Sequence, residues 1–358
     1  MSLRIATLTD FEETPSSRFR MRQYFSNLES RGIYLHDFYR RYSTETAGSI
    51  NGNIRIRHNF TLIVKAIMHE TANIGLRLID IINANKYDAI WLSRQLIIGY
   101  PTFEHLIKKP LIYDIDDAIY LTGKSSYLQF KIACKKSSAI IAGNNFLAEE
   151  ASKYCGNVHV VPTAVDTNRW FPKEFVNNNL SEETEFKIGW SGTSASFYYL
   201  QPYQAEINKF LNDFPCAKIY IMSDRFPYEL NQLKSRVNFI KWSSEIEVDF
   251  IRSLHVGLMP LKDDLWSRGK CAYKMLLYAS CGIPVIVTPV GVNKTILEME
   301  DIGFGPIQKG EWYASLQELY KDTAKHKRFS ENAVRLVNEK FSVNIFAPII
   351  EKILIQSV

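Results

Sequence analysis

The chain has 358 residues, a length that predicts two domains of comparable size instead of a single core. Apolar residues make up 46% and charged residues 23% of the chain, and the formal net charge is +5, so the composition is globular and excludes a disordered or fibrous protein. The five cysteines are scattered and form no C-x-x-C pair, which argues against a disulfide framework or a zinc site and favours a reducing compartment.

The sequence shows neither a membrane-spanning segment nor a targeting signal. Its apolar stretches are interrupted by charge or proline before they reach the length of a bilayer, and the first residues contain no secretory signal. We therefore expect a cytoplasmic protein without a transmembrane helix.

In the first half of the chain, short apolar runs alternate with helical patterns, as they do in parallel sheets covered by helices. Strands are expected at residues 3–8, 89–93, 110–115, 138–143 and 158–165. Helices are expected at 16–32, where Gly32 ends the pattern, and at about 60–85, 101–108, 126–136 and 145–153. These elements make one doubly wound unit.

A polar, turn-rich stretch at 166–185 interrupts this pattern and is predicted to be a linker. The alternation then restarts, with strands expected at 186–192, 217–223, 237–242, 255–261 and 283–289. A last helix, at about 344–358, lies beyond the strands of the second unit. The sequence therefore predicts an α/β protein with two Rossmann-like, doubly wound domains, at 1–165 and 186–343.

Ligands of open parallel sheets bind at the carboxyl ends of the strands. One such end carries GWSGTSAS at 189–196, whose small residues let a ligand approach phosphate-binding backbone N–H groups, above all at Gly192 and Thr193. The run is not a G-x-G-x-x-G, so a dinucleotide that carries a hydride is not expected. The alternative is a tight turn between strand and helix.

The run SRGKCAYKMLLYASCGIPVIVTPVGV at 267–292 is the most informative part of the chain. Lys270 and Lys274 are four residues apart, so on a helix they would share one face, with Arg268 just before them. Cations at the start of a helix oppose the helix dipole unless an anion lies between them, so these side chains predict a diphosphate site. The alternative is an amphipathic helix with solvated lysines.

YDIDD at 113–117 places Asp116 and Asp117 at the end of a predicted strand. Adjacent carboxylates raise each other's pKa and are candidates for acid–base work or for orienting a hydroxyl group. Asp114 and Asp116 also form a D-x-D, a weak signal for a metal, and a helix cap is the structural alternative. The histidines show no spacing typical of metal ligands, so no metal site is predicted.

Positive charge is concentrated near the start of the chain, at Arg18, Arg20, Arg22, Arg40, Arg41, Arg55 and Arg57. These arginines form either a solvated basic face or a surface that meets anionic lipid head groups on the inner face of a membrane. The segment 60–82 has apolar residues at helical spacing, which we expect to cover the sheet: Leu62, Ile63, Ala66 and Ile67. No nucleic-acid-binding module accompanies the arginines, so nucleic acid is not an expected partner.

The run GLMPLKDDLWSRGKCAYKMLLYASCGIPVIVTPVGVN at 257–293 resembles the donor-site signature of glycosyltransferase family 4, a family with the GT-B fold. KIGWSGTSASFYYL at 187–200 is similar to the opening strand and phosphate loop of the same domain. Upstream, PSSRFR, YDAIWLSRQ, PLIYDIDDAIY, AIIAGNNFLAEEA and VVPTAVDTNRWFP resemble successive blocks of the family's acceptor domain. The resemblance therefore covers nearly the whole chain.

The resemblance implies a GT-B glycosyltransferase whose two domains face each other across a cleft and whose C-terminal helix, 344–358, crosses back to the first domain. The second domain would bind a nucleotide-diphosphate sugar. The first would bind a glycan or lipid-linked glycan acceptor of cell-surface polysaccharide assembly. Transfer would retain the anomeric configuration and would need neither a metal nor a cofactor.

Site residues are implied by the same resemblance. Asp116 or Asp117 stands where many members have a histidine or an aspartate at the reacting sugar. Residues on the acceptor side would be Ser17, Arg18 and Arg94. The diphosphate would be neutralised by the backbone of Gly192 and Thr193 and by the side chains of Arg268, Lys270 and Lys274.

The donor run departs from the family pattern at two positions. The glutamates that usually contact the sugar and the ribose are replaced by Gly269 and Leu277, and residues 193–199 lack the usual arginine–lysine pair. A nucleotide-sugar epimerase of the same fold and a non-catalytic nucleotide-sugar-binding or assembly protein are therefore the alternatives to the transferase.

Overall fold

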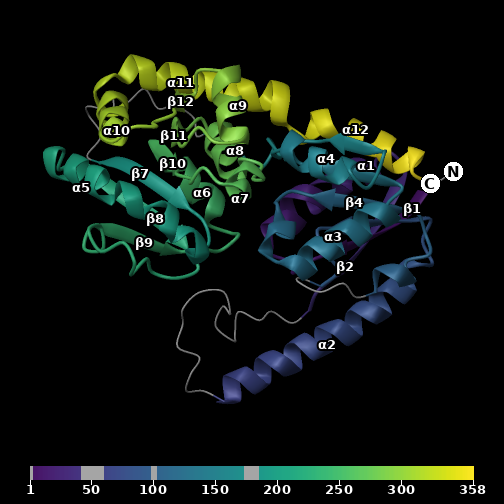
Figure 1. Cartoon of the computed structure of the whole chain (residues 1–358). Coiled ribbons are helices and arrows are strands. Elements are labelled where there is room, and N and C mark those ends of the chain that lie inside the picture. The colour runs from purple at the N-terminus through teal and green to yellow at the C-terminus, as the bar shows by residue number, and fades with distance from the viewer. Residues whose placement is uncertain (1–2, 42–59, 98–102, 173–184) are drawn as a thin grey trace. The chain divides into compact units, whose positions relative to one another are not determined.

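The computed structural model describes residues 3–41, 60–97, 103–172 and 185–358, and it forms two compact units (Figure 1). The first unit comprises Met1–Thr163, Gly269–Cys271 and Val343–Val358, and the second comprises Ala164–Arg268 and Ala272–Ser342. Each unit is built on its own parallel sheet of six strands.

The sheet of the first unit has the strand order β2-β1-β3-β4-β5-β6. Its strands are β1 (Leu3–Thr9), β2 (Ile33–Tyr39), β3 (Ala89–Ser93), β4 (Leu111–Ile115), β5 (Ala139–Ala142) and β6 (Val158–Val160). All neighbouring strands are parallel, so their carboxyl ends lie along one edge of the sheet. The strand order reverses between β1 and β3, which is where open sheets of this kind bind ligands.

The strands predicted from the sequence do not include β2, which lies at the edge of the sheet. Only Ile33 and Phe38 are buried, and they point to opposite faces of the sheet, whereas Tyr34 and Tyr39 are exposed. A strand with one neighbour and a half-exposed surface lacks the continuous apolar run that marks the buried strands.

The helices of the first unit are α1 (Phe25–Glu29), α2 (Phe60–Ala84), α3 (Lys124–Lys136), α4 (Asn145–Ser152) and α12 (Val343–Gln356). The helix expected at 16–32 begins with a π-turn over Ser17–Met21 and a 3₁₀ turn over Arg22–Tyr24. Gly32 ends it with a φ of 82°. Of the helix expected at 101–108, the described part contains only a 3₁₀ turn, Glu104–Leu106.

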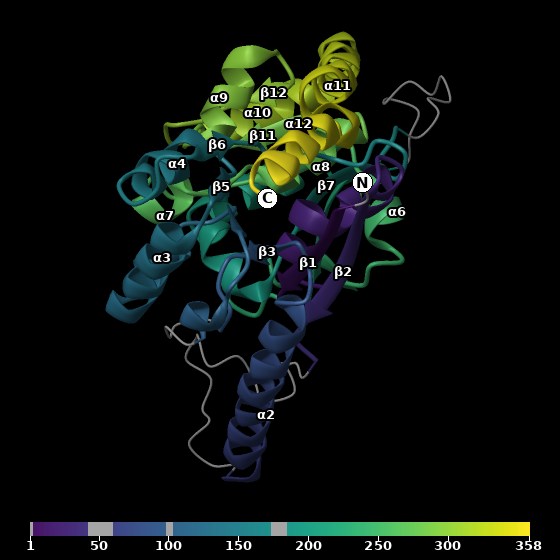
Figure 2. The same cartoon turned by 90° about the vertical axis from the view of Figure 1, so that its right-hand side faces the viewer.

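The C-terminal helix α12 belongs to the first unit, as predicted. It packs on α1, and Arg31 at the end of that helix forms an ion pair with Glu351 of α12, with 3.0 Å between Nη1 and Oε2. Helix α2, in contrast, runs away from the sheet of its own unit (Figures 1 and 2). Within the described residues, no helix combines the length and the apolar run that crossing a bilayer requires.

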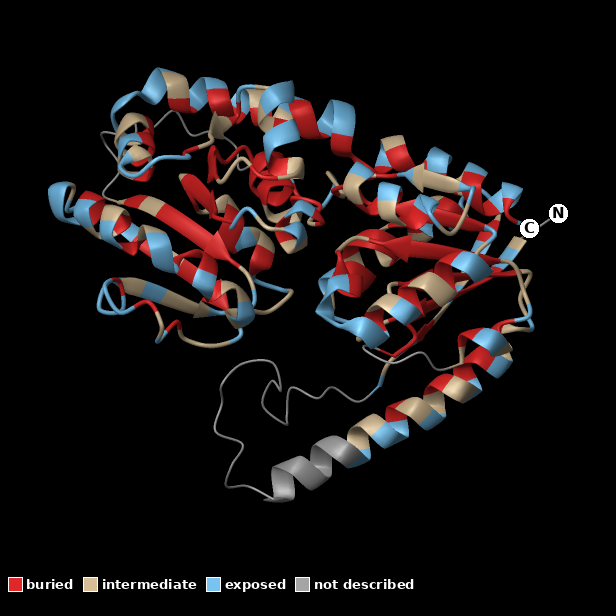
Figure 3. Ribbon diagram, in the orientation of Figure 1, coloured by how far each residue is buried: buried red, intermediate tan, exposed pale blue. Residues whose placement is uncertain are grey.

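The core of the first unit lies on the faces of its central strands, which Figure 3 shows as almost wholly buried. Ile90 and Leu92 of β3, Leu111 and Tyr113 of β4, and Ile140 of β5 belong to one apolar cluster. Burial of each such side chain stabilises the fold by about 1.5–3 kcal/mol. These strands therefore hold the residues at their carboxyl ends in fixed positions.

The sheet of the second unit has the order β12-β11-β10-β7-β8-β9. Its strands are β7 (Phe186–Ser191), β8 (Ala217–Ser223), β9 (Val237–Lys241), β10 (Val256–Met259), β11 (Val285–Val287) and β12 (Gly303–Phe304). Its helices are α5 (Gln204–Asp213), α6 (Glu247–Arg252), α7 (Leu265–Arg268), α8 (Tyr273–Ser280), α9 (Val292–Met299), α10 (Glu311–Lys321) and α11 (Thr323–Leu336). The strand order reverses between β7 and β10, so the loop after β7 lies at the switch point.

Residues 164–172, which comprise the last two residues of the predicted first domain and the start of the predicted linker, pack with the second unit. The backbone N–H of Val165 donates to the carbonyl of Phe341 at 2.8 Å, and Trp170 is 1% exposed. The rest of the predicted linker, 173–184, lies outside the described residues.

Candidate functional site

One guanidinium joins the ends of two neighbouring strands in the first unit. Arg94 directly follows β3, and Asp116 and Asp117 follow β4. Arg94 donates from Nε to Asp116 Oδ1 at 2.6 Å and from Nη2 to Asp117 Oδ2 at 2.7 Å. The structure therefore brings the predicted acceptor-side arginine together with the two predicted catalytic aspartates.

The backbone of Arg94 is in the left-handed region, with a φ of 58°. For a residue other than glycine this conformation costs about 1–3 kcal/mol, and it persists where surrounding contacts enforce it. Here the N–H of Arg94 donates to the carbonyl of Asp114 at 2.8 Å, and its side chain is held by the two carboxylates. Strain of this kind is typical of functional sites.

Asp116 is ionised in this arrangement. Burial alone would raise its pKa, but the charge and the hydrogen bond of Arg94 outweigh burial and hold the pKa of Asp116 below its usual value. The expectation that adjacent carboxylates raise each other's pKa is therefore wrong for Asp116, because the arginine between them dominates. A carboxylate with a lowered pKa is a weak base and a good hydrogen-bond acceptor.

A second ion pair lies buried beside the first. Arg20, on the π-turn, donates from Nε to Oδ1 of Asp114 in β4 at 2.9 Å, and from Nη1 to the carbonyl of Val161 at 2.8 Å. Burial raises the pKa of Asp114 to about 6, although Arg20 opposes this shift. Arg20 also helps to lower the pKa of Asp116.

The block PSSRFR contains a further residue that the sequence interpretation did not assign to the site, while the acceptor-side roles of Ser17 and Arg18 remain predictions. Ser17 is completely buried and Arg18 lies 4.0 Å from Glu13, whereas Arg20 forms the pair that supports the site. This role of Arg20 could not be predicted from its charge or from its position four residues into a helical pattern. Its partner Asp114, inside a buried strand, was the available clue, because a buried carboxylate requires a cation.

The short segment Gly269–Cys271 is part of the first unit and lies against the two aspartates. Lys270 Nζ is 3.7 Å from Asp117 Oδ1, and Cys271 Sγ donates to the carbonyl of Asp116 at 3.0 Å. Asn144, the N-cap of α4, donates to the carbonyls of Gly269 and Lys270 at 3.0 and 3.2 Å. Lys270 is thus a neighbour of Asp117.

The prediction that Lys270 and Lys274 share one helix face is wrong. Helix α8 begins only at Tyr273, after Ala272, whose φ of 53° is left-handed. Lys274 lies in the first turn of α8, whereas Lys270 precedes the helix. The spacing of four residues therefore does not place the two ammonium groups together.

The two positions that lack the family's glutamates are closely packed. A Cβ atom on Gly269 would lie 2.6 Å from Cβ of Ala118, and Leu277 in α8 is 4% exposed. A glutamate at either position would displace its neighbours or bury a carboxylate in apolar surroundings, at a cost of several kcal/mol. The packing around Gly269 and Leu277 is therefore incompatible with the glutamates that the family usually has at these positions.

In the second unit, Lys274 reaches the carboxyl end of β7. Its Nζ lies 4.6 Å from the ring centroid of Trp190, in that strand. A Cβ atom on Gly192 would lie 2.3 Å from this Nζ, so only glycine permits the approach. An ammonium group in the first turn of a helix is opposed by the helix dipole, and an anion beside it would relieve that opposition.

The loop after β7 uses two of its N–H groups within the protein. Gly192 donates its N–H to the carbonyl of Met222 at 3.1 Å, so this N–H is engaged within the sheet, and the phosphate-binding role of the Gly192 backbone remains a prediction. Ser194 donates from N to Asp224 Oδ1 at 2.6 Å and from Oγ to Oδ2 at 2.7 Å. Thr193, between them, is extended and precedes the 3₁₀ helix Ser194–Tyr199.

Asp224 is a loop partner that the sequence interpretation missed, although it directly follows the predicted strand 217–223. Burial would raise its pKa, but the hydrogen bonds from Ser194 lower the pKa below the usual value. The predicted phosphate ligand Arg268 forms an exposed ion pair with Asp263, 2.8 Å between Nε and Oδ1. Exposed pairs of this kind contribute little to stability, because water and salt screen the two charges.

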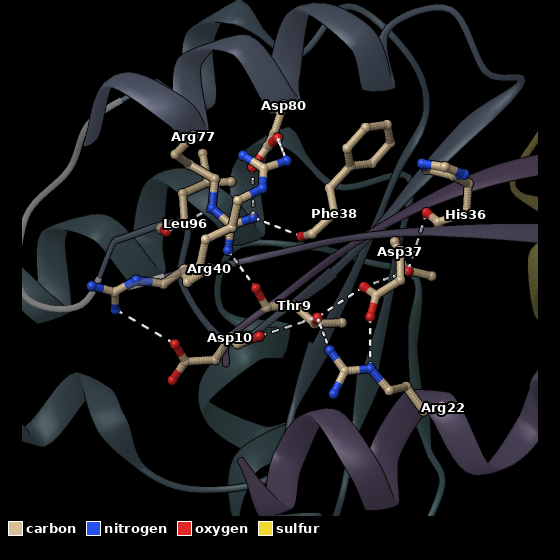
Figure 4. A network of polar contacts seen from close by, with 12 residues as sticks. Thr9, Asp10, Arg22, His36, Asp37, Phe38, Arg40, Arg77, Asp80 and Leu96 are labelled. Atoms are coloured by element: carbon tan, nitrogen blue, oxygen red, sulfur yellow. Dashed lines mark hydrogen bonds and ion pairs between the residues drawn. The ribbon is translucent and has the colours of Figure 1, made fainter. Parts of the chain in front are cut away.

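The arginines near the start of the chain do not form a free basic face. Each of four described members has an acidic partner: Arg20 with Asp114, Arg22 with Asp37, Arg40 with Glu70, and Arg41 with Asp80. Figure 4 shows the Arg22–Asp37 pair, with the Arg40–Asp10 and Arg77–Asp80 pairs beside it, at the carboxyl ends of β1 and β2. Arg55 and Arg57 lie outside the described residues.

A metal site is not evident in the described parts of the chain, where no group of histidine, cysteine, aspartate and glutamate side chains has a suitable arrangement. The carboxylates of the D-x-D are each engaged by an arginine, Asp114 by Arg20 and Asp116 by Arg94.

No protein-family model and no curated protein sequence matches the chain. Solved structures match it over its whole length. HepE of Anabaena, in complex with UDP and glucose, matches with a TM-score of 0.68 at 14% identity, covering 99% of this chain and 100% of that one. Sucrose-phosphate synthase from Thermosynechococcus elongatus matches with a TM-score of 0.65 at 13% identity, covering 99% of this chain and 98% of that one.

WaaG, a glycosyltransferase involved in lipopolysaccharide biosynthesis, matches with a TM-score of 0.62 at 11% identity, covering 98% of this chain and 99% of that one. These matches span both sheets and the C-terminal helix. The chain therefore has the GT-B fold, as the sequence resemblance predicts.

Proposed function

We propose that this chain is a glycosyltransferase that moves a sugar from a nucleotide-diphosphate sugar to a glycan or lipid-linked glycan acceptor. The observation that carries the proposal is the position of Lys274 Nζ against Gly192 and Trp190, at the switch point of the second sheet. In the same fold, HepE has been crystallised with UDP-glucose. The ammonium group supplies positive charge for a departing diphosphate.

The first unit serves the reacting sugar and the acceptor in this proposal. Asp116 and Asp117 accept hydrogen bonds from sugar hydroxyls, and Arg94 fixes the direction of both carboxylates. The lowered pKa of Asp116 makes this group unsuited to remove a proton from an alcohol. Retaining transfer, in which the departing phosphate receives the acceptor proton, fits such a weak base.

Metal independence is part of the proposal. It is supported by the arginine partners of Asp114 and Asp116, which occupy the carboxylates of the D-x-D. Lys274 takes the role of neutralising the diphosphate. Turnover that is unchanged by a chelator supports this part, and turnover that requires added manganese overturns it.

Attachment to an anionic membrane, which would bring a cytoplasmic enzyme to a lipid-linked acceptor of cell-surface polysaccharide assembly, remains a prediction from the sequence. The arginines near the start of the chain support this prediction less than their number suggests, because Arg20, Arg22, Arg40 and Arg41 form ion pairs with acidic side chains. Co-sedimentation with vesicles that contain or lack anionic lipid, at low and high salt, tests it.

A panel of nucleoside diphosphates and their sugars tests donor binding directly. A ligand at 100 times its dissociation constant adds about 2.7 kcal/mol to the free energy of unfolding, which is readily seen as a thermal shift. We expect stabilisation by one nucleoside diphosphate and by its sugars, and loss of this effect in Lys274→Ala. No shift with any member of the panel would contradict the proposal.

A further inference from the structure

Helix α3 (Lys124–Lys136) is basic and contains no acidic residue. Its sequence, KSSYLQFKIACKK, carries four lysines, and within the described part of the chain no carboxylate forms an ion pair with any of them. The lysines on outer helices of the second unit differ, because each has an acidic partner four residues further on: Lys209 with Asp213, Lys294 with Glu298, and Lys327 with Glu331. The charge of α3 is therefore not compensated within the helix.

The positions of these lysines are unfavourable for an isolated helix. Lys131 and Lys135 are four residues apart, and like charges at this spacing destabilise a helix. Lys124 lies in the first turn, where the helix dipole opposes a cation. The dipole favours cations only in the last turn, at Lys135 and Lys136. An anionic surface beside the helix would relieve both unfavourable contributions.

Exposed leucines share this side of α3 with the lysines. Lys124, Leu128, Lys131 and Lys135 follow one another at intervals of four, three and four, so they lie on one side of the helix. Leu128 is 48% exposed, and Leu121, in the turn before the helix, is 41% exposed. We call these five residues the α3 surface. The opposite side is buried in the core of the unit through Phe130, Ala133 and Cys134.

The helix next to α3 leaves the positive charge in excess. Residues 124–153, which include α3 and α4, contain five lysines and two glutamates and no other charged residue, a net charge of +3. Of the glutamates, Glu150 accepts a hydrogen bond from Tyr127 Oη at 2.8 Å and pairs with Lys153 at 2.6 Å. Glu149 is the exposed one. Lysines combined with exposed leucines are typical of a helix that lies in the interface of a bilayer.

Helix α2 lacks this combination. Among its described side chains the charged ones are ion-paired within the first unit: Glu70, Arg77 and Asp80. Ile81 belongs to the apolar core, in line with the expectation that this segment covers the sheet, whereas Ile79 and Ile82 are exposed. The residues on which that expectation rests lie outside the described side chains: Leu62, Ile63, Ala66 and Ile67.

The α3 surface begins close to the carboxylates at the end of β4. A 3₁₀ turn, Ile119–Thr122, connects Asp117 to α3, and the N–H of Ile119 donates to the carbonyl of Asp117 at 2.9 Å. Leu121 follows Asp117 by four residues, so their Cα atoms are at most about 14 Å apart. A bilayer in contact with Leu121 would therefore hold a lipid-linked acceptor beside this carboxylate.

We propose that the α3 surface binds an anionic lipid bilayer. The lysines pair with the phosphates of lipid head groups, and Leu121 and Leu128 enter the boundary between head groups and acyl chains. The exposed leucines favour lipid over an acidic protein or nucleic acid, which the lysines alone would also attract. The proposal deepens the proposed function by placing membrane attachment on α3 instead of the arginines, and only the delivery of a lipid-linked acceptor rests on that function.

The test is co-sedimentation of the full chain with vesicles of phosphatidylcholine that contain or lack phosphatidylglycerol. Wild type should bind only the anionic vesicles, and high salt should release it. A lysine near an anionic surface changes binding about fivefold, so Lys124→Glu/Lys135→Glu should bind at least about 25-fold more weakly. The matched control is Lys294→Glu/Lys327→Glu, which makes the same change in net charge at two exposed lysines of the second unit and should bind like wild type.

Leu128→Ser tests the apolar part, since it should weaken binding without a change in charge. Three results would overturn the proposal: no binding by wild type, an equal loss in the control pair, or binding that survives Lys124→Glu/Lys135→Glu and is lost in Arg55→Glu/Arg57→Glu. Retention of wild type on immobilised polyglutamate, without binding to vesicles, would show that an acidic protein is the partner instead.

The thermal shift by nucleoside diphosphates, measured on the same variants, separates this proposal from the proposed function. The lysine substitutions lie in the first unit and should leave the shift unchanged, which also shows that the variants are folded. Vesicle binding without any nucleotide shift would support the α3 surface and contradict the transferase. A nucleotide shift without vesicle binding would support the transferase and overturn the α3 surface.

Discussion

Arg94 donates one hydrogen bond to Asp116 and a second to Asp117, so one guanidinium at the end of β3 orients both carboxylates at the end of β4. Its backbone is left-handed, and it is one of two such residues other than glycine among those described; the second is Ala272. Strained backbone and paired carboxylates thus coincide at Arg94, which we take as the acceptor side of the site.

Substitution of Arg94 by alanine should reduce turnover by about a hundredfold and leave the affinity for nucleoside diphosphates unchanged. The reason is that misplacing positioned groups costs about this factor, whereas the proposed donor site lies in the other unit. Steady-state kinetics with calorimetry checks both parts. Arg328→Ala is the control, because Arg328 forms an exposed pair with Asp301, 3.0 Å between Nη2 and Oδ2. Wild-type turnover in Arg94→Ala would refute the role.

Substitutions of Lys270 and Lys274 should have different effects on binding and turnover. Lys274→Ala should weaken nucleoside-diphosphate binding by about 1.5–3 kcal/mol, the size of a charge-assisted hydrogen bond. Lys270→Ala should leave this binding intact and lower turnover, because Lys270 pairs with Asp117. Calorimetry on both variants measures the difference, with the exposed Lys294→Ala as control. Equal losses of affinity in Lys270→Ala and Lys274→Ala would instead show that both lysines contribute to one phosphate site.

Gly192→Ala should reproduce the defect of Lys274→Ala. The added methyl would lie 2.3 Å from Lys274 Nζ and 2.9 Å from the Trp190 ring, so the ammonium group has to leave its place. The double variant should bind no worse than Lys274→Ala alone, since both changes remove the same interaction. Gly156→Ala, where nothing lies within 4 Å, is the control. Additive losses in the double variant would show that Gly192 acts through something other than Lys274.

The Asp114–Arg20 pair should affect how the free energy of unfolding depends on pH. Burial raises the pKa of Asp114 to about 6 in the folded chain, above its value of about 3.9 in an unfolded one. Between these values the folded state binds more protons, so the contribution of Asp114 to the free energy of unfolding falls as pH rises from about 4 to about 6 and is constant above. The measurement is the difference in free energy of unfolding between wild type and Asp114→Asn.

That difference should decrease across this window and level off near neutral pH. Asp114→Asn should also be less stable at pH 7 by about 3–5 kcal/mol, because Arg20 is left buried without its partner. A difference that grows as pH rises from 4 to 6 would mean that Arg20 lowers the pKa of Asp114 more than burial raises it.

Much of the fold could be predicted because its central strands are buried on both faces. The runs AIWLS and LIYDI are continuous apolar segments, and the structure has β3 and β4 there. The edge strand β2 could not be found in the same way, since a strand with one neighbour exposes half of its side chains. A local apolar run indicates a strand that is buried on both faces. This signal therefore misses a strand that pairs with only one neighbouring strand.

The candidate site could be predicted only where it depends on strand ends. Asp116 and Asp117 lie at the sheet edge because β4 ends at Ile115. The pairing of Arg94 with them requires the order of the strands, which no local pattern gives. Lys270 and Lys274 have helical spacing, but Ala272 breaks the helix with a conformation that alanine rarely adopts.

The central claim is that this GT-B chain transfers a sugar from a nucleotide-diphosphate donor held by Lys274. The most direct measurement is the release of nucleoside diphosphate from a panel of nucleotide sugars, without acceptor, by wild type, Lys274→Ala and Lys294→Ala. We expect slow release from one donor by wild type and Lys294→Ala, and little or none by Lys274→Ala. Release that is equal in all three proteins, or a wild type that binds a nucleotide sugar and never cleaves it, would contradict it.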